Sequence, residues 1–256
     1  MDTLSTIISR SIRSFKLRGL GPTIRLALFA VARVGRGSTI DLRRQLTLEA
    51  FEREHGVDIG NFIELKDLDI ASPNKHSGVR YGATTRETFR QLIDTLPILY
   101  HEFTFVDFGS GKGAVLLYAS EYPFKEVVGV EFSPELNEIA ERNLACYRST
   151  SRKCHSVTAL CIDAATYDLP SGSLVLYFNA PFGAAVWKVV LKNLNIAIQE
   201  SPYNGYLVFL NYGWDQEAAL LVDCASFLKC IVNDGAYRIY EFGGSSKLRS
   251  GTFVLA

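Results

Sequence analysis

The sequence has no excess of charge of either sign, and it lacks the residue patterns of several common binding sites. Its 256 residues carry 27 basic and 27 acidic side chains, so no net field favours nucleic acid or an anionic membrane. The five cysteines form no C-x-x-C pair, and their odd number argues against a disulfide framework. The four histidines lie far apart without metal-ligand spacing, so we expect no metal site. A reducing, cytoplasmic setting fits this composition best.

Long hydrophobic runs are also missing. The apolar stretch LALFAVARV, residues 26–34, is too short to cross a hydrocarbon core of about 30 Å, and Arg25 and Arg33 bound its apolar part. The basic residues near the N-terminus continue past residue 40 with no A-x-A-like site, which argues against a secretory signal. A hydrophobic content of 48% is enough for the core of a large α/β domain, with or without an appendage.

Residues 1–75 are predicted to form a helical appendage. The first helix would place four apolar residues on one face, namely Leu4, Ile8, Ile12 and Phe15. A second would begin at TIRLALFAVARV, and a third, LRRQLTLEAFERE, would follow Asp41 and end at Gly56. Residues 1–50 hold nine Lys or Arg against three Asp or Glu. The appendage could therefore cover the rest of the chain, or its basic first helix could touch membrane lipid or a partner protein.

From Thr84 onward, strands and helices alternate, which predicts an α/β domain over residues 76–256. TTRE is expected to be a capping box, Thr84 with Glu87, before a helix that Pro97 ends. Five apolar strands are expected at FTFVDF, EVVGVEF, VTALCID, SLVLYFN and YLVFLNY. One late strand from CIVN to YRIYEF and another at GTFVLA would close the chain. Such strands suit a mostly parallel seven-stranded sheet with helices on both faces.

Polar residues follow four of these strands, at the edge where ligands bind such sheets. Asp107 and a loop with Gly109, Gly111 and Gly113 follow the first strand, and glycine permits positive φ and close backbone approach. The other three groups are Glu131, placed to grip the two hydroxyls of a ribose, Asp163 with Ala164, placed to meet an adenine amino group, and NAPF at residues 179–182. Each group alone has a structural reading as a turn, a cap or a surface side chain. Their recurrence at successive strand ends indicates a nucleotide-like cofactor.

D-x-G-S-G-K-G, GVE, IDA and N-A-P-F together resemble the motifs of class I methyltransferases that use S-adenosylmethionine, over roughly residues 80–256. VDFGSGKG with VGVEFSPELNEIAERN is further similar to seven-strand protein lysine methyltransferases, a pattern that many uncharacterised bacterial proteins share. The resemblance implies a Rossmann-like fold and a cofactor site formed by Asp107, Gly109, Ser110, Gly111, Gly113, Glu131, Phe132, Asp163, Ala164 and Asn179.

The resemblance also implies where the methyl acceptor lies. In amine- and amide-methylating enzymes an N-P-P-[YF] loop holds a nitrogen, so Asn179, Pro181 and Phe182 are expected at the acceptor, although Ala180 replaces the first proline and loosens the loop. Tyr81 and Thr84, from RYGATT, are expected over the cofactor. Aromatic walls would lower the pKa of a lysine acceptor by desolvation, with candidates at Tyr177, Phe178, Phe182, Tyr212 and Trp214.

We therefore expect methyl transfer to a nitrogen, with a protein lysine favoured. The alternatives are a small-molecule oxygen, sulfur or carbon acceptor, or a binding protein of the same fold without catalysis. A dinucleotide site is less compatible, although Gly109-x-Gly111-x-x-Ala114 fits its fingerprint, because Asp107, Gly113 and the late antiparallel strands are not part of that motif. Lys112 is expected to face solvent, since the Walker pattern that would give it a phosphate is absent.

Overall fold

The computed structural model describes residues 42–200, 204–210, 213 and 215–243. The chain divides into two compact units, Met1–Ala50 and Phe51–Ala256. A helix occupies residues 42–55, and Gly56 ends it as predicted, with φ 68° and its N–H on the Glu52 carbonyl at 2.8 Å. The first two predicted helices, and the strand expected at GTFVLA, lie outside the described residues. The domain boundary expected between residues 75 and 76 stays a prediction.

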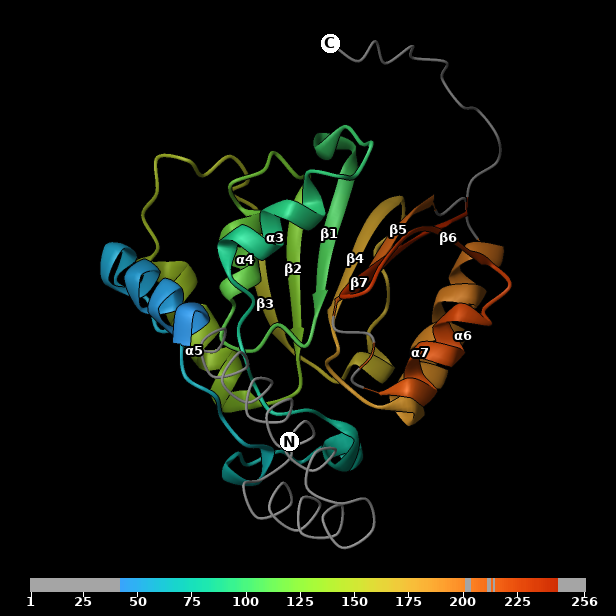
Figure 1. Ribbon diagram of the computed structural model, residues 1–256, viewed down its shortest axis with the longest axis horizontal. Helices are drawn as coiled ribbons and strands as arrows, with labels where there is room; N and C mark the ends of the chain where they lie inside the picture. Colours follow the sequence, from blue (N-terminus) through green and yellow to red (C-terminus); the bar gives the residue numbers. More distant parts are fainter. Residues whose placement is uncertain (1–41, 201–203, 211–212, 214, 244–256) are drawn as a thin grey trace, which may run out of the picture. The chain divides into compact units, whose positions relative to one another are not determined.

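Seven strands form one sheet in the order β3-β2-β1-β4-β5-β7-β6 (Figure 1). Strands β1 to β5 are parallel, and β7 runs antiparallel to both β5 and β6. The strands are β1 Phe103–Phe108, β2 Glu126–Glu131, β3 Val157–Cys161, β4 Ser173–Asn179, β5 Asn204–Leu210, β6 Leu228–Asp234 and β7 Tyr237–Phe242. The mostly parallel seven-stranded α/β sheet is thus confirmed.

The single strand predicted from CIVN to YRIYEF is wrong. The chain turns between β6 and β7, where the Ala236 N–H donates to Asp234 Oδ1 at 3.2 Å, and the two strands pair as a hairpin. Asp234-Gly235 is a common hairpin-turn dipeptide, so the signal for this turn was present in the sequence.

Helices cover both faces of the sheet, as Figure 1 shows, with α6 and α7 on one side and α3, α4 and α5 on the other. The helices are α3 Arg86–Ile93, α4 Ala114–Ala119, α5 Pro134–Cys146, α6 Ala184–Glu200 and α7 Gln216–Asp223. On the α6 side, Trp187 is fully buried among the rings of Phe178, Phe182 and Phe209. Within the described part of the chain, no helix is both long and apolar enough to span a bilayer.

The capping box predicted at Thr84 and Glu87 is wrong by one residue. Thr85 caps α3, its hydroxyl accepting the Thr88 N–H at 3.2 Å. Thr84 instead turns inward, where its hydroxyl lies 3.1 Å from the Tyr177 hydroxyl in the core. Two adjacent threonines offer the same local cap, and the buried tyrosine 93 residues away decides between them.

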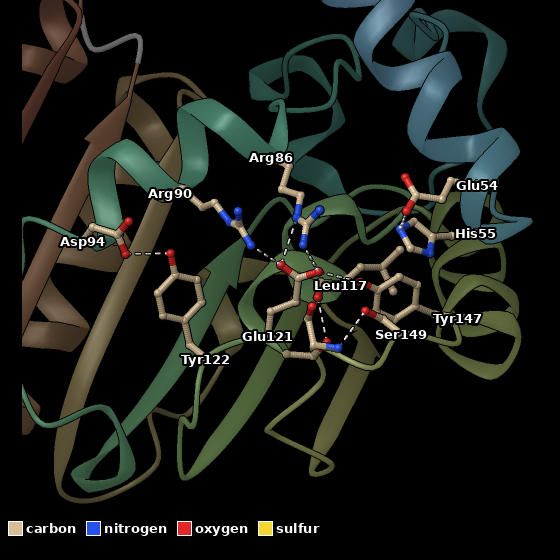
Figure 2. A network of polar contacts seen from close by, with 12 residues as sticks. Glu54, His55, Arg86, Arg90, Asp94, Leu117, Glu121, Tyr122, Tyr147 and Ser149 are labelled. Carbon is tan, nitrogen blue, oxygen red and sulfur yellow. Dashed lines mark hydrogen bonds and ion pairs between the residues drawn. The ribbon is translucent and has the colours of Figure 1, made fainter.

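A buried carboxylate ties α3 to the chain that follows α4 (Figure 2). Glu121, only 5% exposed, accepts two hydrogen bonds from Arg86, at 2.7 and 2.9 Å, and one from Arg90 at 3.2 Å. The Tyr147 hydroxyl donates to the same carboxylate at 2.8 Å. Because α3 begins two residues after Thr84 and α4 begins directly after the glycine loop, this network fixes two segments that line the site described next.

Candidate active site

Two adjoining clefts open beyond the carboxyl ends of the parallel strands. The first, the Asp107 cleft, has an empty volume of about 650 Å³ and is lined by predicted site residues Tyr81, Asp107, Gly109, Ser110, Glu131, Phe132, Asn179 and Pro181. The second, the Asp163 cleft, has about 340 Å³ and is lined by Gly109, Phe132, Asp163, Ala164, Pro181 and Phe182. Gly111 and Gly113 line neither cleft. The structure therefore brings all but these two predicted residues to one connected site.

The glycine loop adopts the positive φ values that its composition predicts, 77° at Gly109, 53° at Gly111 and 80° at Gly113. The room left by the missing Cβ atoms is filled by the protein itself, whereas we expected a cofactor to fill it. A Cβ at Gly109 would lie 2.4 Å from Pro181 Cβ, and one at Gly111 would lie 2.3 Å from the Tyr81 ring. Glycine at these positions lets the two walls of the Asp107 cleft close onto the loop.

Asp107 ends β1 with a buried carboxylate, the residue being 3% exposed. No group among the described residues donates a hydrogen bond to this carboxylate, which lines the Asp107 cleft. Burial, and then the nearby charge of Glu131, raise the pKa of Asp107 well above its usual range. A buried carboxylate without a donor is unfavourable until a cation or donor reaches it. The position fits the ammonium group of the methionine part of S-adenosylmethionine.

Glu131 ends β2 with a carboxylate that the backbone holds in place. Its Oε2 accepts the Gly111 N–H at 2.8 Å and its Oε1 accepts the Ser133 N–H at 2.9 Å. Burial raises the pKa of Glu131 to about 6, although backbone N–H groups of Ser133, Gly111 and Phe132 act in the opposite direction. Each carboxylate oxygen can accept a second hydrogen bond. The pair fits the vicinal hydroxyls of a ribose.

Asp163 follows β3 and is already engaged by the protein. One oxygen, Oδ2, accepts from the Ser72 hydroxyl and from Asn74 Nδ2 at 2.9 Å, and Oδ1 accepts the Ala165 N–H at 2.8 Å. Burial would raise the pKa of Asp163, but these hydrogen bonds outweigh burial and lower it. Asp163 therefore caps the short helix Ala164–Thr166, as one of the two sequence readings held, while it also lines the cleft.

The chain from residue 72 to residue 79 also lies along the two clefts, directly before the predicted residues 80–85, and sequence reasoning missed it. The Gly183 N–H donates to the Ser77 carbonyl at 2.7 Å, and the Val79 N–H donates to the Pro181 carbonyl at 3.2 Å. Gly78 approaches Phe132 so closely that a Cβ there would lie 2.8 Å from its ring. The two hydrogen bonds join residues 106 and 102 apart in sequence, and Gly78 and Phe132 are 54 apart, so no local pattern predicts these contacts.

Asn179 ends β4 in the Asp107 cleft. Its Nδ2 donates to the Thr84 hydroxyl at 3.1 Å, and that hydroxyl also contacts the Tyr177 hydroxyl. Ala180 follows with φ 42°, in the left-handed region, so the loop turns sharply without the proline of the related motif. Tyr81 also lines this cleft, and its hydroxyl donates to the Ile59 carbonyl at 2.6 Å.

The predicted aromatic walls are distributed differently from the expectation. Tyr177 lines the Asp107 cleft together with Asn179. Phe182 lines the Asp163 cleft together with Pro181, whereas Asn179, the other residue expected at the acceptor, lines only the Asp107 cleft. Phe178 is fully buried, stacked on Phe108, and lines neither cleft. Tyr212 and Trp214 lie outside the described residues.

Lys112 does not face solvent, so that expectation is wrong. The residue is 3% exposed, and its Nζ donates to Asp58 Oδ1 at 2.6 Å and to the Gly60 carbonyl at 3.1 Å. Both partners lie more than 50 residues earlier in the chain, beyond the reach of a motif. As for metals, the described residues hold no cluster of His, Cys, Asp and Glu side chains that could bind an ion.

Comparisons with known proteins gave one family match and several similar structures. The family model described as "Histone methylation protein DOT1" matches residues 64–159. No curated protein matches the sequence. A predicted N6-adenine-specific DNA methylase from Listeria monocytogenes is similar in structure, with a TM-score of 0.46 and 14% identity. The match covers 64% of this chain, and this chain spans only about half (52%) of the DNA methylase. An RNA methyltransferase from Salinibacter ruber in complex with S-adenosyl-L-homocysteine is also similar in structure, with a TM-score of 0.43 and 15% identity. The match covers 66% of this chain and 97% of the RNA methyltransferase.

The sheet order separates this chain from dinucleotide-binding proteins. Their sheets are built from six parallel strands in the order 3-2-1-4-5-6. Here the reversed strand β7 stands between β5 and β6. That order, the carboxylates of Asp107 and Glu131 in one cleft and the family match over residues 64–159 agree with one another. The chain therefore has the seven-strand, Rossmann-like fold of class I methyltransferases, and residues 64–159 of it match the histone-methylation family model.

Proposed function

We propose that the protein transfers the methyl group of S-adenosylmethionine to a nitrogen atom, and that the side-chain amine of a protein lysine is the favoured acceptor. The observation that carries the proposal is the position of Asn179. It stands at the end of β4 and lines the same cleft as the unpaired carboxylate of Asp107. The hydroxyl of Thr84 fixes one arm of its amide by accepting from Nδ2.

The chain's own residues have a modest task, because bound S-adenosylmethionine supplies an already activated methyl group. Asp107 and Glu131 orient the cofactor by its methionine part and its ribose, and the walls formed by Tyr81 and Pro181 exclude water. The second arm of the Asn179 amide, Oδ1, and the Ala180 carbonyl accept hydrogens of the target amine, so that its lone pair points at the methyl carbon. Alignment of this kind contributes roughly 7–11 kcal/mol to a displacement.

A lysine acceptor must also lose a proton before it can attack. Its amine has an ordinary pKa near about 10.4. Tyr177 is fully buried beside Asn179, and Tyr81 lines the same cleft, so the amine would leave water as it enters. Desolvation disfavours the ammonium form and lowers that pKa. The neutral amine is then the form held by Asn179.

A protein acceptor is favoured by the family description, which names histone methylation. The matched residues, 64–159, end before the acceptor loop at 179–182, so the choice of nitrogen rests on that loop. We also propose that residues 76–256 form the catalytic domain and residues 1–75 a helical appendage that covers this domain, or whose basic first helix touches membrane lipid or a partner protein. A cytoplasmic location completes the proposal.

The test is a search for the methylated atom. Full-length protein is incubated with cofactor carrying a labelled methyl group and with a bacterial lysate or histone mixture, and labelled products are identified by mass spectrometry after proteolysis. Methyl-lysine formed by the parent and lost in Glu131→Ala supports the proposal. Label on small molecules, or on an oxygen, sulfur or carbon atom, favours the alternative acceptors, and binding of cofactor without any labelled product favours a non-catalytic protein.

A further inference from the structure

Lys112 stands inside the glycine loop, but its side chain lines neither cleft. The side chain is 4% exposed and makes an ion pair with Asp58, Nζ to Oδ1, at 2.6 Å. Its Nζ also donates to the Gly60 carbonyl at 3.1 Å. A buried ammonium needs such partners, because its desolvation is otherwise unfavourable. The glycine loop is therefore fastened to residues 58–60, which we call the strap.

The strap has a backbone that other residues hold in place. Asn143 Oδ1 accepts the Asp58 N–H at 2.8 Å, and Asn143 Nδ2 donates to the carbonyls of Asp58 and Lys112 at 2.7 and 2.8 Å. Glu52 Oε1 accepts the N–H groups of Ile59 and Gly60 at 2.8 and 2.6 Å. Lys112 thus pairs with a segment whose position is already fixed.

Tyr81 is fastened to the same strap. Its hydroxyl donates to the Ile59 carbonyl at 2.6 Å, and its ring lies against Gly111, where a Cβ would be only 2.3 Å away. Gly111 in turn donates its N–H to Glu131. The strap therefore sets the separation between the glycine loop and the Tyr81 wall of the Asp107 cleft, and through Gly111 it bears on the carboxylate assigned to the ribose.

We infer that Lys112 and Asp58 are positioning residues for the cofactor. Their ion pair holds the glycine loop and Tyr81 at the separation that S-adenosylmethionine needs, without touching it. The inference rests on the cofactor assignment and is independent of which atom accepts the methyl group. Removal of either partner lets the loop shift relative to the strap, and coupling of this kind changes ligand affinity by about 3- to 30-fold.

The experiment measures S-adenosylhomocysteine affinity by calorimetry on the full chain. Lys112→Met, which keeps the length and loses the charge, and Asp58→Asn should each weaken binding by about 3- to 30-fold, and the double variant should be no worse than the weaker single variant. Asp58→Glu should restore binding to within about twofold of the parent, because the Asp58 side chain is 57% exposed and a longer carboxylate has room to reach Lys112. Lys188→Met is the matched control, since it breaks an exposed pair with Glu217 at 3.1 Å.

Melting temperature is recorded for each variant. If the ion pair were merely structural, its loss would lower the melting temperature and leave the cofactor affinity of the folded protein unchanged. Unchanged affinity in Lys112→Met, or additive losses in the double variant, overturns the inference. Should Lys112→Met fail to fold, the comparison of Asp58→Asn with Asp58→Glu decides the matter at an exposed position. If the parent protein does not bind S-adenosylhomocysteine, both the cofactor assignment and this inference are overturned. If the parent binds it and the variants bind equally well, only the role inferred for Lys112 and Asp58 is overturned.

Discussion

Cofactor affinity should rise with pH between about 5 and 7, because Glu131 must be ionised to accept both ribose hydroxyls. Burial raises the pKa of Glu131 to about 6. At pH 5, one unit below this pKa, about a tenth of the carboxyls are ionised. The dissociation constant of S-adenosylhomocysteine should therefore be about tenfold higher at pH 5 than at pH 8, a loss of about 1.4 kcal/mol in binding free energy. Calorimetry across pH 5–8 measures this change directly.

Without ligand, the same pKa shift acts on stability with the opposite sign. The native carboxyl binds its proton more tightly than the carboxyl of the unfolded chain, which has the ordinary glutamate pKa of 4.5. The native state is therefore favoured below pH 4.5 and loses about 2 kcal/mol as pH rises through 6. Asp107, whose pKa is raised by burial and by Glu131, adds to this loss in the same direction. Urea denaturation of the ligand-free protein tests the sign.

Glu131→Gln is the control for both measurements. It should weaken S-adenosylhomocysteine by about 1.5–3 kcal/mol at pH 8, the range for hydrogen bonds to a charged group, and should flatten the pH profile. Because Asp107 and Glu131 interact, the profile of the parent reports the pair, and the residual slope in Glu131→Gln reports Asp107. An affinity that is flat from pH 5 to 8 in the parent would refute the assignment of Glu131 to the ribose.

Two further substitutions separate acceptor chemistry from stability. Asn179→Ala should depress kcat strongly and leave cofactor affinity within about twofold, because the interaction is made mainly in the transition state; turnover of acceptor at the parental rate would reduce the loop to a turn. Glu121→Gln should destabilise the fold by about 2–3 kcal/mol in urea denaturation, since it removes the buried charge that pairs with Arg86 and Arg90 (Figure 2), both of which are partly exposed. Glu217→Gln, at an exposed ion pair, should change stability by less than about 0.5 kcal/mol, and equal losses in the two variants would contradict this account.

The strands and the glycine loop could be predicted because their signals are local. β1 is buried along its whole length, so its apolar run is unambiguous, and the glycines need only their own φ values. Lys112 could not be placed, because its ion-pair partner lies 54 residues earlier. The Asp163 carboxylate and the Ser72 hydroxyl meet across 91 residues, which no pattern within one element reports. Side chains that join distant segments depend on the fold and are read only from it.

Phe182 shows the same limit within a motif. The motif places this ring beside the acceptor, yet the structure places it in the Asp163 cleft, against Trp187. Ala180, in place of a proline, takes φ 42°. The spacing of a motif identifies which residues belong to a loop, but the loop's backbone conformation decides which cleft each side chain lines.

Pro181 forms part of both clefts, and this shared wall has a kinetic consequence. With the cofactor assigned to these clefts, spent cofactor would lie against Pro181, the residue that follows Ala180, whose carbonyl is proposed to hold the target amine. Exchange of cofactor should therefore loosen the acceptor, so with the proposed lysine acceptor we expect the substrate to be released after each transfer and higher methylation states to be built distributively. A time course in excess substrate should show the monomethyl product accumulating before any dimethyl product, and early trimethylation at low total conversion would contradict this order.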